Sequence, residues 1–172
     1  DNYRFRLDAP ERACRRNIHA VTIGALLGLA DFRVESFFTA LHLQYLQKHY
    51  PATEISVSLP RIRPLAGDFE IQHPVDDRRF AQLLLAFRLF RPTAGITIST
   101  REKPAFRDGV VRLGVTRMSA GVSTAVGGHS EQASTTQFEI ADTRTVDEVC
   151  ERLTAMGYQP VMHDWNHRLL SA

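Results

Sequence analysis

Short runs of β-branched residues alternate along this chain with longer segments of helical periodicity, and this alternation constrains the fold more than any other feature. The strand-like runs are residues 19–23, 54–59, 95–100 and 112–119. Each has the length and composition of a strand, and each is followed by turn or polar residues. Because helical segments separate them, the strands are expected to run parallel in β/α units.

Helical patterns fill the intervals between these runs. Apolar residues recur at three- and four-residue steps at Val34, Phe37, Phe38, Leu41 and Tyr45, and again at Phe80, Leu83, Leu84 and Phe87. A capping box of Thr145 and Glu148 predicts a third helix that Gly157 ends, and a short helix is expected over residues 9–16. Only about 17 residues separate the starts of the last two strands, so the helix between them must be very short.

These elements predict an α/β fold of consecutive parallel units. The strand-like runs are apolar on both faces, which favours a sheet buried on both sides. A complete (β/α)8 barrel needs roughly 250 residues and eight strands. With 172 residues and four strands, the chain is either a small open α/β sheet or half of a barrel. No internal repeat or low-complexity linker divides it.

Composition excludes several classes of protein. Apolar residues make up 44% and charged residues 23% of the chain, which is typical of a globular protein and not of a disordered one. The longest apolar run, residues 20–30, is too short to span a bilayer. No secretory signal opens the chain, so a cytoplasmic location is expected. The first residue is Asp1 and not Met, which predicts processing or excision from a longer chain.

Arginine and cysteine usage excludes further classes. Of 21 basic residues only Lys48 and Lys103 are lysines, and the arginines are spread along the chain, so no nucleic-acid-binding stripe is predicted. Cys14 and Cys150 alone cannot build a disulfide framework, a zinc site or a cluster, and they are expected to be buried or idle thiols. The spacing of His163 and His167 suits a metal on a helix, but no third ligand accompanies them, so no metal site is predicted.

The ends of the predicted strands carry the candidate chemistry, because parallel β/α folds bind ligands at the C-terminal ends of their strands. Gly24 and Gly28 follow the first strand and allow either close approach of a ligand or tight packing between a strand and a helix. Arg61 follows the second strand in a loop stiffened by two prolines.

Arg101 follows the third strand and offers a fork for a carboxylate, or a salt bridge to Glu102 or another neighbour. Ser119 closes the fourth strand beside it. From the residues alone, we therefore predict a strand-end site lined by arginine and serine, for a ligand that carries a carboxylate.

The same motifs, in the same order, resemble those of a known enzyme family. They are Arg6-Leu7 with residues 10–12, residues 24–33, residues 56–64, residues 99–102 with 106–108, residues 118–124, and Asp164-Trp165. Together they resemble the C-terminal half of the 2-iminoacetate synthases, the radical SAM tyrosine lyases of thiamine thiazole biosynthesis, over essentially the whole chain. A tyrosine lyase of hydrogenase maturation and a tryptophan lyase of antibiotic biosynthesis are related to this family.

The resemblance implies a fold and a reaction. Residues 1–125 would form strands five to eight of a radical SAM (β/α)8 barrel, and residues 126–172 a C-terminal extension. In this family a [4Fe-4S] cluster, held by a Cys-xxx-Cys-xx-Cys loop, reduces S-adenosylmethionine to a 5′-deoxyadenosyl radical. That radical takes a hydrogen from tyrosine, and cleavage of the Cα–Cβ bond yields p-cresol and 2-iminoacetate.

The resemblance also implies roles for individual residues. Arg6 would bind the carboxylate of S-adenosylmethionine, and Arg61 would lie near its adenosyl group. The backbone of Gly24, Ala25, Leu26 and Gly28 would line the same cofactor. Arg101 and Ser119 would hold the carboxylate of the substrate amino acid. No catalytic residue and no metal ligand is assigned in this chain.

The sequence departs from the family pattern in several places. The cluster-binding cysteine loop is absent, so the isolated chain is expected to be inactive and to need the N-terminal half of the barrel as a partner. Thiazole synthase is a further expected partner. The segments around His129 and His163 differ from the family's usual residues, and so do Arg16 and Asn17.

Three other functions remain open from the sequence. One is a related lyase, either of tryptophan or of hydrogenase maturation. Another is a non-catalytic half-barrel that serves as a binding module or forms homodimers through its exposed sheet edges. The third is a regulator that binds amino acids through Arg101 and Ser119.

Overall fold

A four-stranded parallel sheet organises the chain. The computed structural model describes residues 2–63, 70–123 and 140–162. The strands are β1 (Ala20–Ile23), β2 (Glu54–Ser58), β3 (Gly95–Ile98) and β4 (Arg117–Met118). They lie side by side in chain order, and every neighbouring pair is parallel. This arrangement confirms the prediction of consecutive β/α units, and sequential parallel order is also the topology of a (β/α)8 barrel.

Six α-helices and one short 3₁₀ helix accompany the strands in the described residues. They are α1 (Tyr3–Leu7), α2 (Ala9–Arg15), α3 (Phe32–His49), α4 (Asp77–Phe90), α5 (Pro104–Val110), η1 (Val111–Leu113) and α6 (Val146–Ala155). Side chains of Asp31, Asp76 and Thr145 cap α3, α4 and α6, and Glu148 completes the predicted capping box. The short connection predicted before the last strand is α5, whereas α1 was not predicted.

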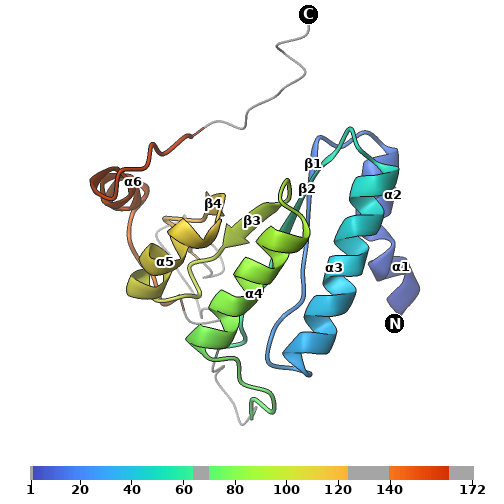
Figure 1. The fold of residues 1–172 in the computed structure, drawn as a ribbon, viewed down its shortest axis with the longest axis horizontal. Helices are drawn as coiled ribbons and strands as arrows, with labels where there is room; N and C mark the ends of the chain where they lie inside the picture. The colour runs from blue at the N-terminus through green and yellow to red at the C-terminus, as the bar shows by residue number, and fades with distance from the viewer. Residues whose placement is uncertain (1, 64–69, 124–139, 163–172) are drawn as a thin grey trace, which may run out of the picture.

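The helices α3, α4 and α5 lie on one face of the sheet, as Figure 1 shows. The core between them and the strands contains Leu43, Leu46, Phe80, Leu84, Phe87, Ile55, Val57, Ile96 and Ile98. These residues are close to fully buried, and the alternate positions of the strands supply the sheet's share of the core.

The opposite face of the sheet is polar, so the expectation of a sheet covered by apolar packing on both sides was wrong. Thr22 and Ser56 alternate with the core residues, and their hydroxyl oxygens are 2.7 Å apart. At the base of the same face Arg117 forms an ion pair with Glu54 at 2.9 Å. The strands alternate in this way because the described helices cover only one side of the sheet.

The apolar stripe that predicted α3 lies at the surface. Val34, Phe37, Phe38 and Leu41 have exposed fractions between 42% and 64%, whereas Leu43 and Leu46 on the same helix are completely buried. The periodicity therefore predicted the helix correctly, but it did not identify the face that packs on the sheet. The exposed stripe is a large apolar surface on the outside of the helical layer.

The fourth strand is much shorter than the predicted 112–119. Residues 111–113 form the 3₁₀ helix η1, and Gly114 ends it with a φ of 98°. This left-handed turn delays the start of β4, because the chain must leave the helix before it can pair with β3. The predicted domain boundary at 125, together with His129, His163 and His167, lies outside the described residues. Among the described helices none is long and apolar enough to cross a membrane.

Candidate functional site

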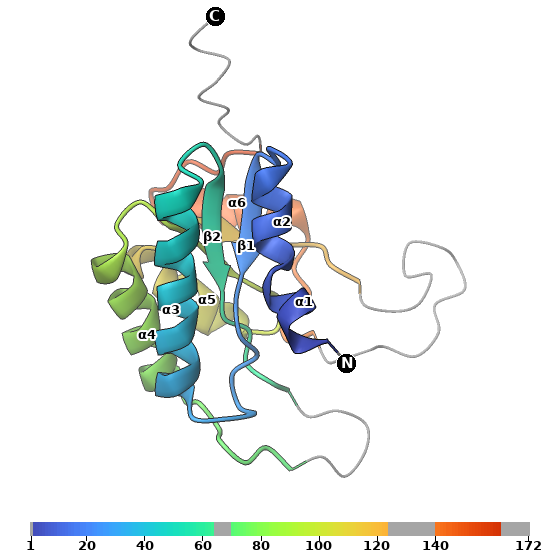
Figure 2. The same cartoon turned by 90° about the vertical axis from the view of Figure 1, so that its right-hand side faces the viewer.

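The C-terminal ends of all four strands meet at one edge of the sheet, because every pair is parallel. Figure 2 shows β1 and β2 ending side by side, with α1 beside the same end. The residues predicted from the strand ends are thereby brought to one side of the molecule. Arg6 lies on α1 and is exposed.

The loop after β1 folds back onto the loop after β2. Leu27 forms a parallel bridge with Arg61, and its N–H donates to the carbonyl of Pro60 at 2.9 Å. A Cβ atom on Gly24 would lie 1.7 Å from the carbonyl oxygen of Ser58. A Cβ on Gly28, where φ is +117°, would lie 2.4 Å from the side chain of Ile62. Both glycines are therefore required for close packing of these two chain segments.

Between the two glycines lies the backbone of Ala25 and Leu26. Within the described residues neither residue makes a backbone hydrogen bond, and both are half-buried. Backbone N–H and C=O groups that are shielded from water need partners. This stretch can therefore donate to and accept from a ligand at the end of β1.

Arg61 is held from several sides. Its Nε donates to both carboxylate oxygens of Glu102 at 3.0 and 3.1 Å, and its Nη2 lies 2.8 Å from Asp77. The guanidinium lies between the rings of Phe80 and Phe106, 5.0 Å from each centroid. Burial by itself would lower the pKa of Arg61, but hydrogen bonds and charge from Glu102 and Asp77 outweigh it and raise that pKa.

These contacts show Arg61 joining the ends of β2 and β3 to the start of α4. Its side chain is only 10% exposed, and its charged group is occupied by protein partners. Its assigned place near the adenosyl group of S-adenosylmethionine stays a prediction.

Glu102 is a site residue whose role the sequence analysis missed. It is 1% exposed, and it binds both Arg61 and Arg63, the latter at 2.9 Å. A signal for this was present in the sequence: two arginines spaced by two in an extended segment point to the same side. The acidic residue after the neighbouring strand lies within their reach.

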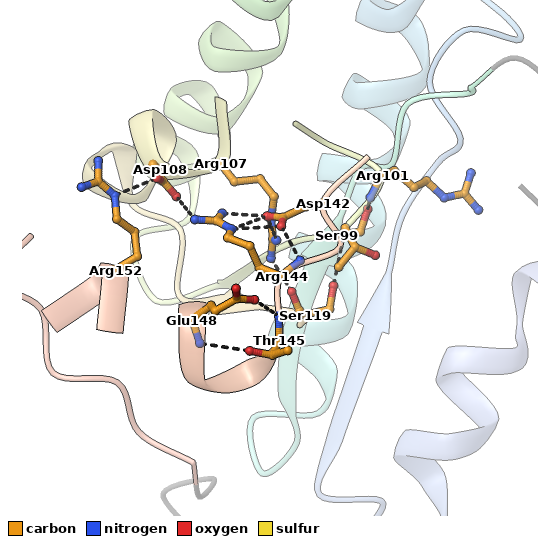
Figure 3. Close-up of polar contacts among 11 residues, drawn as sticks. Ser99, Arg101, Arg107, Asp108, Ser119, Asp142, Arg144, Thr145, Glu148 and Arg152 are labelled. Atoms are coloured by element: carbon orange, nitrogen blue, oxygen red, sulfur yellow. Dashed lines mark hydrogen bonds and ion pairs between the residues drawn. The ribbon is translucent and has the colours of Figure 1, made fainter. Parts of the chain in front are cut away.

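Arg101 and Ser119 lie at the ends of the adjacent strands β3 and β4. The backbone N–H of Thr100 donates to Ser119 Oγ at 3.2 Å, which leaves the hydroxyl hydrogen available to a ligand. The N–H of Arg101 bonds Ser99 Oγ at 3.4 Å. Figure 3 shows the Arg101 side chain extending away from the group of ion pairs on α5 and residues 142–144.

The charge on Arg101 is in an unfavourable setting. Burial lowers the pKa of Arg101, and the positive charge of Arg63 lowers it further, while Glu102 acts in the opposite direction. Because arginine stays protonated in proteins, burial and the repulsion from Arg63 raise the electrostatic energy of this site instead of removing the proton. A carboxylate bound beside Arg101 would relieve this repulsion, which suits the predicted role.

A second group of ion pairs lies beside Ser119, on the side toward α5 (Figure 3). Arg107 is completely buried; its Nη1 forms an ion pair with Asp142, and its Nη2 donates to the carbonyl oxygen of Ser119. Arg144 also binds Asp142 at 2.7 Å and reaches Asp108 at 3.0 Å. Burial would raise the pKa of Asp142, but hydrogen bonds from Arg144 and Arg107 outweigh it and hold that pKa at about 2.

Residues 140–142 cover the end of β3. The N–H groups of Ala141 and Asp142 both donate to the carbonyl oxygen of Thr100 at 3.0 Å. Nothing in the sequence analysis identified Asp142 or Arg144, because their partners Arg107 and Asp108 are 35 and 36 residues away in the chain.

The two cysteines lie on different helices in the part of the chain that the structure describes. Cys14 is buried on α2 and Cys150 lies on α6. Burial raises the pKa of the Cys14 thiol, which disfavours the thiolate that a metal requires. Within the described ranges no group of three or more His, Cys, Asp or Glu residues could hold a metal ion.

Comparisons with known proteins agree with the motifs. Residues 58–159 match the family model of the Biotin and Thiamin Synthesis associated domain. The chain is 41% identical over 167 residues to 2-iminoacetate synthase of Escherichia coli (strain K12) and 40% identical over 164 residues to that of Salmonella typhimurium. These matches cover 96% and 94% of this chain but only 44% of each relative.

Two solved structures are also similar. One is HydG, a maturase of the [FeFe]-hydrogenase, with a TM-score of 0.79 and 35% identity over 91% of this chain and 35% of that one. The other is HydG from Carboxydothermus hydrogenoformans, with a TM-score of 0.78 and 34% identity over 95% of this chain and 38% of that one.

Proposed function

The chain belongs to the family of the Biotin and Thiamin Synthesis associated domain, and on this basis we propose that it is the C-terminal half of a radical SAM lyase that cleaves tyrosine to 2-iminoacetate and p-cresol. The identity of 41% to a 2-iminoacetate synthase supports this assignment. Because the chain spans only 44% of that relative, the activity belongs to a longer protein or to a complex with the N-terminal half of the barrel.

The observation that carries the proposal is the pairing of Arg101 and Ser119 on adjacent strand ends. Because these strand ends are neighbours, the guanidinium of Arg101 and the hydroxyl of Ser119 would both donate to one bound carboxylate. The repulsion between Arg63 and Arg101 increases the gain from binding an anion there. Fixing the carboxylate also fixes the amino group of the substrate relative to the bound cofactor.

S-adenosylmethionine suits the other part of the same edge and would supply the radical chemistry when bound. The backbone of Ala25 and Leu26, which makes no backbone hydrogen bond within the described residues, would hold it, and Gly24 and Gly28 keep that backbone close to the end of β2. Arg6 on α1 would bind its carboxylate. The protein's part in the reaction is then to bind, orient and exclude water.

The [4Fe-4S] cluster of the family does not fit this chain. Two cysteines on separate helices cannot provide the three thiolates of the family's loop. We therefore assign the cluster to the N-terminal half of the barrel.

A lyase of the hydrogenase-maturation type is the second candidate, because two similar solved structures are HydG proteins at 34–35% identity. The thiamine type is preferred because the identity to 2-iminoacetate synthase is higher over a similar share of the chain.

The test uses the complete protein beside the isolated 172-residue chain. With S-adenosylmethionine, reductant and tyrosine, the complete protein is expected to form p-cresol, and the isolated chain is expected to form none. Replacing tyrosine with tryptophan in the same assay separates the two amino-acid substrates. Formation of p-cresol by the isolated chain, or its absence with the complete and cluster-loaded protein, would refute the proposal.

A further inference from the structure

Arg107 is a buried cation that joins two segments distant in sequence. It comes from α5, its exposed fraction is 0%, and its two terminal nitrogens bind different acceptors. One acceptor is the carboxylate of Asp142, and the other is the main-chain carbonyl of Ser119. A planar guanidinium can hold two such acceptors at once in fixed directions, which a lysine ammonium does not do.

Both acceptors lead directly to the carboxylate site. Ser119 carries the hydroxyl of that site, and its Oγ accepts the N–H of Thr100 at 3.2 Å. Asp142 donates its own N–H to the carbonyl of Thr100 at 3.0 Å, so Thr100 is held from both sides. Arg101 follows Thr100 directly in the chain. The position of the Arg101 backbone therefore depends on contacts that converge on Arg107.

Asp142 is itself fixed by a second arginine. Arg144 bonds its carboxylate at 2.7 to 3.2 Å, and the same arginine is anchored to Asp108 at 3.0 Å. Arg152 contacts the outer end of this group, at Asp108, with a side chain that is 53% exposed. The buried pair of Arg107 and Asp142 thus lies next to the strand ends, and the exposed Arg152 lies away from them (Figure 3).

We propose that Arg107 is a positioning residue for substrate binding: with Asp142 it locks residues 140–142 onto the ends of β3 and β4 and so sets the separation of Arg101 and Ser119. The inference rests on the proposed function of these two residues as the carboxylate clamp. Buried ion pairs are expensive to desolvate and add little net stability over apolar packing. A role in fixing the geometry of the carboxylate site explains why a buried ion pair is present at Arg107 and Asp142.

The experiment replaces Arg107 with lysine in the complete, cofactor-loaded protein. Arg107→Lys keeps a positive charge beside Asp142 but loses the second donor to Ser119. We expect the dissociation constant for tyrosine to rise by about tenfold or more, since small misplacements of binding groups are costly. Affinity for S-adenosylmethionine, which is assigned to the other strand ends, should not change. Arg152→Gln is the matched control and should change neither affinity.

Amide hydrogen exchange gives a readout that does not depend on tyrosine. In Arg107→Lys the amides of Thr100 and Asp142 should exchange faster, whereas those of β1 and β2 should keep wild-type rates. Should the lysine variant fail to fold, the double variant Arg107→Met with Asp142→Leu fills the same space with apolar groups and serves instead. It also lacks the donor to Ser119, so the same changes are expected.

The two proposals fail in different ways. Unchanged exchange at Thr100 and Asp142 in a folded variant would overturn the positioning role, whatever the enzyme's substrate. Unchanged tyrosine affinity, with wild-type protein that binds tyrosine normally, would overturn it as well. Faster exchange in the variant, combined with wild-type protein that binds no tyrosine, would sustain the positioning of the strand ends and refute the proposed function.

Discussion

Arg61 and Glu102 tie the end of β2 to the end of β3: Arg61 Nε lies 3.0 and 3.1 Å from the two carboxylate oxygens of Glu102. Glu102 is 1% exposed and also binds Arg63. One buried carboxylate therefore neutralises two arginines at the candidate site. The proposed function assigns Arg101, one residue earlier in the chain, to the carboxylate of a ligand.

Glu102→Gln should destabilise the protein strongly. The change leaves Arg61 and Arg63 without their shared counterion, and breaking a buried ion pair costs about 3–5 kcal/mol. Asp77→Asn is the control: its side chain is 69% exposed although it also binds Arg61, so its loss should cost less than about 1 kcal/mol. Urea unfolding measures the free energy of unfolding of both variants. Equal losses of stability in Glu102→Gln and Asp77→Asn would contradict the central role of Glu102.

Gly24→Ala should also be destabilising, because the added Cβ would lie 1.7 Å from a main-chain oxygen of Ser58. Neither strand can shift without breaking the ladder between β1 and β2. Gly109→Ala is a matched control within α5, where a Cβ meets nothing within 4 Å. There alanine should stabilise by about 0.5–1 kcal/mol. Thermal unfolding of the two variants should shift in opposite directions.

The lowered pKa of Asp142 predicts that the folded protein loses stability in acid. Its pKa is about 2 in the folded protein against an ordinary value of 3.8. A lowered folded pKa contributes stability above the unfolded value, and this contribution disappears as the pH falls from about 4 toward 2. Asp142→Asn should have a lower free energy of unfolding than wild type at pH 7, and this difference should become smaller over that acid range. A difference that stays constant, measured by unfolding at each pH, would show that Asp142 has the same pKa in the folded and unfolded protein.

Arg101→Ala in the complete protein should weaken tyrosine binding by about 10- to 100-fold, which is the usual effect of losing a charged hydrogen bond. Binding of S-adenosylmethionine should persist. Lys103→Ala removes an exposed cation from the same loop and should leave both affinities unchanged. Calorimetric titration distinguishes the two variants, and tyrosine affinity that survives Arg101→Ala would remove the clamp from the proposal.

The two faces of α3 should respond differently to truncation. Leu46 is completely buried, so Leu46→Ala should cost about 2–5 kcal/mol. Phe38, although larger and part of the stripe that predicted the helix, is 64% exposed, and Phe38→Ala should cost less than about 1 kcal/mol. Chemical denaturation of the isolated chain compares them. A larger loss for Phe38 would show that its face is covered in solution.

The sequence by itself determined the order and type of most elements. Periodicity, caps and turn residues act within a few positions, so the apolar repeats indicate α3 and α4, and the capping box of Thr145 marks the start of α6. Parallel strands then require that their C-terminal ends share an edge, and this placed Arg101 and Ser119 together in advance. The order of the motifs also indicates the family without the fold.

Only the tertiary structure decided which residue partners which. Glu102 stands next to Arg101 in the chain, yet its shortest contacts are with arginines from the neighbouring strand end. Arg107 and Asp142 are 35 residues apart, and no local pattern encodes their meeting. The buried face of α3 likewise depends on where the sheet lies, since a helical repeat defines a stripe but not its neighbour. Long-range pairing is set by packing of the whole chain, which is why the supports of the site appear only in the folded structure.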